Sequence, residues 1–198
     1  MPLKEQQLRL REDVILQAVN ELLARKGYDA MTVDEVAAAV GLTKPSLYKH
    51  FPSKEALAAA ALVRLLDQTL AVMASQPADE PPAQRLRALL RWALEQHLRG
   101  AMPLLPSTRS GLRDSLLKNS AYVDRLQAVS GTLMQWIAQA QAEGSLSRAL
   151  PAEVILYTLY ARTCDPVLEF LQASGQYADD QVVDLVLATC FDGLAPRA

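Results

Sequence analysis

Cysteine and histidine are scarce in this chain, which contains two of each among its 198 residues. Cys164 and Cys190 are too few for a disulfide framework and form no metal-binding motif. Small buried cysteines usually act as hydrophobic side chains, and a redox role for this pair is the alternative. The chain also lacks a paired-histidine metal site, a nucleophile elbow and a phosphate-binding glycine loop. The sequence therefore predicts no catalytic residues, no metal and no cofactor.

Long hydrophobic runs are also absent. Charged residues interrupt every apolar stretch well before 18 residues, so we expect no membrane-spanning segment and no membrane partner. The first twelve residues lack the apolar core of a signal peptide. These two absences predict a cytoplasmic protein.

An excess of positive charge is missing as well, because the formal net charge is −2. Residues 1–55 contain eight Lys or Arg and eight Asp or Glu. This balance excludes a generic basic protein that coats nucleic acid. If the chain binds DNA, it must do so through placement, with lysines on one side and carboxylates such as Asp13, Glu21 and Asp34 turned elsewhere.

Residues 32–51 carry the most informative pattern, two short helices joined by a glycine turn. Thr32 and Glu35 have the spacing of a capping box, which satisfies two backbone N–H groups at a helix start. Gly41 directly follows the apolar positions of this first helix, where a left-handed backbone can end it. The apolar positions recur close to the helical period and are Val33, Val36, Ala37 and Val40.

The second helix of this pattern is expected to start at Thr43 as its cap, with Pro45 in its first turn. If Leu47 and Phe51 point to the core, polar side chains occupy the other faces. Two short helices joined by a turn form the helix-turn-helix, whose second helix enters the DNA major groove. The alternative is a solvated hairpin whose lysines only face water. The polar side chains are Lys44, Ser46, Tyr48, Lys49 and His50.

Residues 41–57 read Gly-Leu-Thr-Lys-Pro-Ser-Leu-Tyr-Lys-His-Phe-Pro-Ser-Lys-Glu-Ala-Leu. This run resembles the signature of the tetracycline-repressor-like (TetR) family of bacterial transcription regulators, and the likeness covers about residues 9–70. The resemblance implies that Tyr48, His50 and Lys54 contact phosphates, and that Lys44, Ser46 and Lys49 read bases. Many members carry glycine where this chain has Pro45. The full set of implied DNA-binding residues is Thr32, Thr43, Lys44, Pro45, Ser46, Tyr48, Lys49, His50 and Lys54.

The rest of the chain shows helical periodicity and no convincing alternation of period two, so the predicted fold is all-α. We expect an N-terminal three-helix DNA-binding domain over 1–54, a connecting helix over 55–75 and a C-terminal helical domain for ligand binding and dimerisation over 80–198. The proline-rich loop 76–82 is the predicted boundary. The first helix should end at Lys26-Gly27. Further helices are predicted at about 86–98, 108–118, 120–143, 151–173 and 179–194.

The last two predicted helices have apolar residues on more than one side. One side can face the chain's own core, and the other favours a partner, which predicts a four-helix interface in a homodimer. TetR-family dimers are similar in this respect. A large monomeric core is the alternative. The predicted interface residues are Val167, Phe170, Leu171, Val182, Val186 and Cys190.

Scattered apolar and polar side chains in the second domain suggest a cavity for a small, largely apolar ligand. Each candidate also has the commoner interpretation of a core residue. Arg109 and Arg113 are candidates for contact with an acidic ligand, with solvated surface arginines as the alternative. The candidate ligand-binding residues are Trp92, His97, Met102, Tyr122, Trp136 and Tyr160.

Together these patterns predict a ligand-responsive, sequence-specific transcriptional regulator. In this hypothesis a homodimer represses transcription from a palindromic DNA operator, and a small molecule releases it by moving the helix at about 54–74. A helical enzyme that processes a small molecule and a protein-binding adaptor are the alternatives.

Overall fold

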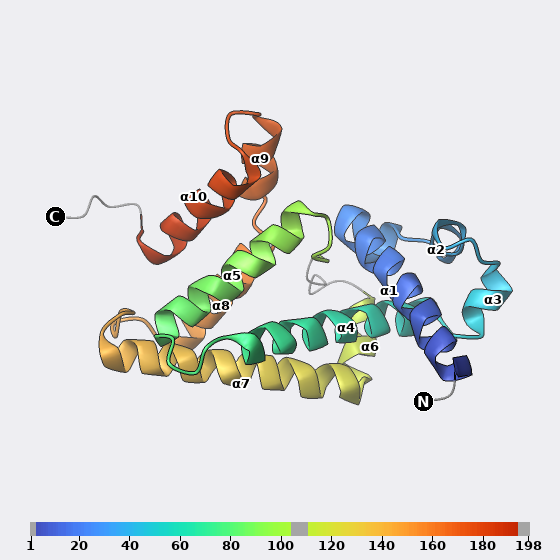
Figure 1. Ribbon diagram of the computed structural model, residues 1–198, viewed down its shortest axis with the longest axis horizontal. Helices are drawn as coiled ribbons and strands as arrows, with labels where there is room; N and C mark the ends of the chain where they lie inside the picture. Colours follow the sequence, from blue (N-terminus) through green and yellow to red (C-terminus); the bar gives the residue numbers. More distant parts are fainter. Residues whose placement is uncertain (1–2, 104–110, 194–198) are drawn as a thin grey trace. The chain divides into compact units, whose positions relative to one another are not determined.

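The structure is a computed structural model that describes residues 3–103 and 111–193. Within these residues every regular element is a helix, which confirms the all-α prediction. The bounds are α1 Leu3–Ala30, α2 Val33–Ala39, α3 Lys44–Tyr48, α4 Lys54–Ser75, α5 Pro82–Leu98, α6 Leu112–Lys118, α7 Ser120–Glu143, α8 Ala152–Arg162, α9 Val167–Ala173 and α10 Asp179–Phe191 (Figure 1).

The chain forms two compact units that do not follow one cut in the sequence. The first contains Met1–Asp67 and Gly100–Arg125, and the second contains Gln68–Arg99 and Leu126–Ala198. Helices α4 and α7 each contribute to both units. The linear sequence did not indicate that α6 and the start of α7 would join the N-terminal unit. The functional domain bounds 1–54, 55–75 and 80–198 stay predictions.

The first unit has its own hydrophobic core, built from α1, α2, α3, α4 and α6. Ile15 and Val19 of α1 and Val36 of α2 are fully buried in it. Leu47 is the one residue of α3 that is buried, and Leu57 opens the buried face of α4. Phe51 packs against this core and is half-buried, as the predicted anchoring pair required.

The second unit buries the apolar face of α5 against the C-terminal helices α8, α9 and α10 (Figure 1). The apolar positions of α5 recur at helical spacing, so one stripe of the helix can be withdrawn from water. Tyr160 of α8 and Ser130 of α7 share a hydrogen bond of 2.9 Å between their hydroxyl groups. The buried residues of α5 are Pro82, Leu86, Leu89, Leu90, Ala93 and Leu94.

The predicted helix over 151–173 is wrong, because the structure has two helices there. Pro166 has no N–H to continue the helical pattern. The Val167 N–H donates instead to the Asp165 carboxylate at 3.1 Å, and the Asp165 N–H donates to the Arg162 carbonyl at 3.3 Å. These bonds end α8 and begin α9, so the helix breaks at the proline.

Several other predicted bounds need adjustment. Helix α1 continues to Ala30, with non-helical backbone angles at Gly27, where the sequence predicted its end. The predicted helix near 108–118 starts at Leu112, and residues 108–110, including Arg109, lie outside the described residues. Helix α10 ends at Phe191.

Helix α4 is long and apolar enough to cross a membrane by length and composition alone, which the sequence analysis did not anticipate. Its first half packs into the core of the first unit through Leu57, Ala58, Ala61 and Leu62. In the structure 33% of this apolar window is buried, so packing within the chain covers only part of it.

We predict that Leu57→Ala lowers the free energy of unfolding by about 2–5 kcal/mol, because it leaves a cavity in a buried core. Urea unfolding of the full chain measures this change. Leu117→Ala is the matched control, since Leu117 of α6 is exposed and its truncation should cost within about 0.5 kcal/mol. Equal losses in the two variants would contradict the assigned core.

Candidate nucleic-acid interface

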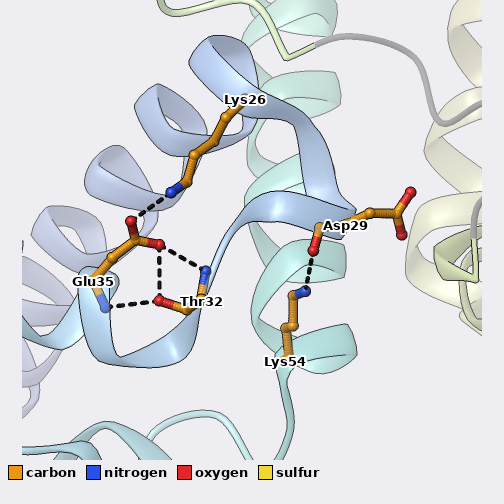
Figure 2. A network of polar contacts seen from close by, with 5 residues as sticks. All are labelled: Lys26, Asp29, Thr32, Glu35 and Lys54. Atoms are coloured by element: carbon orange, nitrogen blue, oxygen red, sulfur yellow. Dashed lines mark hydrogen bonds and ion pairs between the residues drawn. The ribbon is translucent and has the colours of Figure 1, made fainter.

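Helix α2 begins with the capping box that the sequence predicts. The Thr32 hydroxyl oxygen accepts from the Glu35 N–H at 3.3 Å, and the Glu35 carboxylate accepts from the Thr32 N–H at 3.0 Å. Lys26 of α1 forms an ion pair with the same carboxylate, as Figure 2 shows. The bonds from Lys26 and Thr32 lower the pKa of Glu35 to about 2. The start of α2 is thereby tied to the end of α1.

The turn after α2 is closed by backbone hydrogen bonds. Gly41 has φ of +66°, the left-handed conformation that glycine adopts at little cost. The Leu42 N–H donates to the Ala37 carbonyl at 2.9 Å, and the Gly41 N–H donates to the Ala38 carbonyl at 3.3 Å. This is the Schellman arrangement, and it sends the chain sharply into α3.

Helix α3 is short, and both its start and its orientation are fixed locally. The Thr43 hydroxyl oxygen accepts from the Ser46 N–H at 3.3 Å, which confirms Thr43 as the cap, and Pro45 lies in the first turn. Leu47 is 1% exposed and anchors the helix to the core. The regular helix ends at Tyr48, although the Phe51 N–H still donates to the Leu47 carbonyl at 3.0 Å.

Two large polar side chains, at the last residue of α3 and at its C-cap, face away from the core. Tyr48 is 40% exposed, and Lys49 is also exposed. Within the described part of the chain, Lys49 has no ion-pair partner. The Ser46 hydroxyl bonds to that of Thr43 at 2.9 Å and is half-buried. The side chains of Tyr48 and Lys49 are therefore accessible to a large ligand such as duplex DNA.

Lys44 is not free, because its Nζ lies 2.9 Å from the Asp34 carboxylate of α2. The hydrogen bond with Asp34 raises the pKa of Lys44 above its ordinary value. The sequence-based expectation that Asp34 turns away from the lysines was wrong. The two residues lie ten positions apart, and only the tight turn brings them together.

His50 is more enclosed than the sequence analysis expected, with a side chain 12% exposed. Its Nδ1 lies 3.4 Å from the Glu12 carboxylate of α1, and its ring packs near that of Phe51. The assigned role of His50 as a phosphate contact stays a prediction. What the structure adds is a link between the end of the α3 segment and α1.

Lys54 opens α4 beside the loop that precedes α2. Its Nζ lies 4.3 Å from the centre of the Tyr28 ring. The same Nζ lies 3.5 Å from the Asp29 carbonyl oxygen, as Figure 2 shows. The Tyr28 hydroxyl donates to the Glu55 carboxylate at 2.8 Å, and burial together with this bond raises the pKa of Tyr28 well above its usual range. The Ser53 hydroxyl caps the helix by accepting from the Ala56 N–H at 3.1 Å.

Sequence reasoning missed the groups that hold these polar side chains. Glu12, Tyr28 and Asp34 each contact a predicted DNA-binding residue from a different helix. Their separations along the chain follow no motif, so the sequence alone contains no signal for them.

The model of the family described as bacterial regulatory proteins, tetR family, matches residues 15–61, which contain α2, the turn and α3. The helix-turn-helix of this chain is therefore part of a TetR-family DNA-binding domain, as the motif at 41–57 predicted.

The TetR-family chain is similar to regulators of known sequence and structure. It is 26% identical to the HTH-type transcriptional regulator TcmR of Streptomyces glaucescens over 151 residues, 76% of this chain and 63% of the length of TcmR. The structure of the fatty acid degradation regulator FadR from Bacillus halodurans aligns with a TM-score of 0.66 at 18% identity, covering 94% of this chain and 97% of FadR. The regulator AibR, solved in complex with isovaleryl coenzyme A and operator DNA, aligns with a TM-score of 0.59 at 20% identity, covering 91% and 98%. The two structures show that the whole chain shares the fold of such regulators.

The six candidate ligand-binding residues of this regulator do not fall in one unit. Met102 and Tyr122 belong to the first unit, where Tyr122 packs against the core. In the second unit, His97 donates from Nδ1 to the Thr163 carbonyl at 3.0 Å, and Trp136 lies 5.7 Å from the Arg85 guanidinium. Trp92 is half-buried in α5, and Tyr160 shares its hydroxyl hydrogen bond with Ser130. A ligand-binding role for the set stays a prediction.

The predicted dimer-interface residues divide into two groups. Val182 and Val186 are buried within the second unit, so they belong to the regulator's own core and cannot meet a partner as assigned. Phe170 is 73% exposed, while Val167, Leu171 and Cys190 are half-buried. Burial raises the pKa of the Cys190 thiol. The exposed apolar residues of α8, α9 and α10 are Val154, Tyr157, Phe170 and Leu185.

We predict that Glu35→Gln destabilises the protein in a pH-dependent way. The folded pKa of about 2 lies below the ordinary value of 4.5, so the charged form contributes stability above pH 4.5 and this contribution disappears as the pH falls toward 2. Thermal unfolding at pH 7, 5 and 3 should show a difference from the unaltered protein that narrows in acid.

The control for this prediction removes the largest cause of the shift. In a Lys26→Gln background, the effect of Glu35→Gln on stability at pH 7 should be smaller, because the ion pair with Lys26 is already absent. The capping box does not add to the difference, since Gln at position 35 still completes it. A difference that stays constant from pH 7 to pH 3 would show that the Glu35 charge is not coupled to folding.

Proposed function

We propose that this TetR-family protein is a homodimeric repressor that binds a palindromic operator and is released by a small-molecule effector. One observation carries the proposal: α3 is fixed by its cap and by buried Leu47, while Tyr48 and Lys49 remain exposed on its other side. A recognition helix needs this combination of a rigid mount and free polar side chains.

In this proposal the polar residues of the hairpin have two different roles in DNA binding. Tyr48, His50 and Lys54 position the protein on phosphates, and Lys44, Ser46 and Lys49 read base edges. Thr32 and Thr43 cap the starts of α2 and α3, where backbone N–H groups approach the DNA, and Pro45, which has no N–H, lies beside them in the first turn of α3. Because few lysines take part, we expect a modest salt dependence, set by a few phosphates per subunit.

The exposed apolar side chains of α8 and α9 support a dimer. Tyr157 and Phe170 are large aromatic residues that a monomer would leave in water. Two subunits that cover them in a two-fold arrangement present two recognition helices, which suits a palindromic site. Half-sites about one turn of DNA apart are the expected spacing.

The effector is proposed to act through α4, which runs from the first unit into the second. Its first residue, Lys54, contacts Tyr28 and Asp29, so a displacement of α4 would directly reach the end of α1, just before α2. A coupling of about 1–3 kcal/mol is enough for a five- to 150-fold change in DNA affinity. AibR was solved with isovaleryl coenzyme A, which makes acyl coenzyme A compounds the first class to test here. The candidate side chains favour an apolar portion of the ligand, since Trp92, Trp136 and Tyr160 are aromatic.

A regulatory role is proposed here in place of catalysis, and a cytoplasmic location follows from binding to operator DNA. The protein-binding adaptor is the competing function of the hairpin. Selection of bound fragments from a random DNA library separates the two, because it tests DNA binding, site symmetry and half-site spacing together. Recovery of no enriched sequence at low salt would favour the adaptor.

We predict that Tyr48→Ala weakens binding to operator and non-operator DNA alike, because a phosphate contact carries no sequence information. Gel-shift titration with both DNAs measures this. Tyr177→Ala is the matched control, since Tyr177 has the same 40% exposure and lies outside the hairpin. An unchanged affinity for Tyr48→Ala would remove the assigned phosphate contact.

We predict that Lys49→Ala relaxes the preference at one operator position by about 1–3 kcal/mol, the usual discrimination of a good base contact. Competition titrations with single-base operator variants measure the preference at each position. Lys118→Ala at the end of α6 removes the same charge and should leave every preference intact. A uniform loss of affinity in Lys49→Ala would assign this lysine to phosphate.

We predict that the double variant Tyr157→Ser, Phe170→Ser shifts the protein from dimer to monomer, since buried aromatic residues at an interface each contribute roughly 2 kcal/mol or more. Sedimentation velocity over a range of concentrations measures the association. Leu117→Ser, an exposed apolar residue of the first unit, is the control. An unchanged dissociation constant would place the interface elsewhere.

A further inference from the structure

The lysines of the DNA-binding hairpin are unequally accessible to a negatively charged partner. Residues 32–57 contain three lysines and three carboxylates. Lys54 lies over the Tyr28 ring, and Lys44 is paired with Asp34. Lys49 has no such partner in the described part of the chain. The cation at the start of α3 is therefore neutralised before any DNA arrives.

Asp34 is not needed to start α2. Thr32 and Glu35 make both bonds of the capping box, and Glu35 also takes the ion pair with Lys26. The Asp34 side chain is 68% exposed, and its described contact is with Lys44. An exposed ion pair of this kind adds little to folding stability. Asp34 also lies in the first turn of α2, where a negative charge favours the helix start, so its pair with Lys44 is a second role beside that one.

The pair changes what DNA experiences at this end of α3. The two charges lie 2.9 Å apart, well within the screening length of about 8 Å at physiological salt. A phosphate consequently meets a nearly neutral pair where it would otherwise meet a lysine. The Lys44 ammonium has three N–H donors, so one can stay on Asp34 while others reach acceptors on a base edge.

We propose that Asp34 is a positioning residue that determines operator specificity. It orients Lys44 for base readout and cancels the attraction of Lys44 to phosphates on DNA of any sequence. The pair persists in the operator complex. Operator binding therefore keeps the base contact of Lys44, while the affinity for other DNA gains nothing from the charge of Lys44. This inference rests on the proposed function of the hairpin in DNA binding.

The test is Asp34→Asn, which removes the charge and keeps the size of the side chain. Non-operator DNA should bind more tightly, with a salt dependence steeper by about 0.9 per subunit, the contribution of one phosphate contact. Between 200 mM and 50 mM salt, this corresponds to an additional gain of about threefold per subunit. The ratio of operator to non-operator affinity should fall, and the preference at the base read by Lys44 should relax. Fluorescence anisotropy with both DNAs at several salt concentrations measures all three quantities.

Asp67→Asn is the matched control, because it removes the same charge and frees Arg125 from a pair 2.6 Å long in the same unit. Asp67→Asn should not steepen the salt dependence by about 0.9 per subunit. It should also leave the ratio of operator to non-operator affinity unchanged. In a Lys44→Ala background, Asp34→Asn should lose its effect on the salt dependence. Thermal unfolding of each variant shows that the fold is retained.

The outcomes separate this inference from the function on which it rests. If the unaltered protein distinguishes operator from non-operator DNA but Asp34→Asn leaves the salt dependence unchanged, the inference is wrong and the proposed function stands. If Asp34→Asn gains as much affinity for the operator as for non-operator DNA, or more, the Asp34–Lys44 pair breaks on specific binding. That result also overturns the inference. If Asp34→Asn still steepens the salt dependence in the Lys44→Ala background, the effect is general repulsion between Asp34 and DNA, and the inference is wrong. If the unaltered protein binds no DNA, both proposals fail.

Discussion

The burial of Leu47 is the constraint on which the DNA-binding surface depends. Helix α3 has five residues, far fewer than an isolated helix needs for stability in water. It is therefore held by its local cap at Thr43 and by Leu47, which the fold around it buries. Once Leu47 enters the core formed by α1, α2, α4 and α6, the helical period directs Tyr48 and Lys49 away from that core.

Contacts with other parts of the first unit also fix the positions of the polar side chains. Asp34 holds Lys44, Glu12 lies beside His50, and the Tyr28 ring lies under Lys54. The first contact joins α2 to α3, the second joins α1 to the segment after α3, and the third joins α1 to α4. A protein with net charge −2 can read DNA if its cations are placed one by one, because sequence-independent attraction is then small and the remaining contacts decide where it binds.

The second unit provides the surfaces that a regulator needs beyond its DNA contacts. Its core is closed by α5 and the C-terminal helices, with Val182 and Val186 inside. Tyr157 and Phe170 remain outside, where a second subunit would remove them from water. The break at Asp165–Pro166 separates the helices that carry these two aromatic residues, so their relative placement depends on the hydrogen bonds of that break. Helix α4 contributes to both units and gives them a continuous connection.

Local patterns determined what the sequence alone could predict. The capping box at Thr32 and Glu35, the left-handed Gly41, the cap at Thr43 and the inward Leu47 involve residues at most four positions apart, and all four predictions are confirmed. Tertiary structure decided the rest. Which side of α10 faces its own core, which carboxylate meets Lys44 and which helices accompany α6 depend on groups brought together by the turns between helices. No period or spacing in the chain encodes such contacts, because they are fixed only when the helices pack.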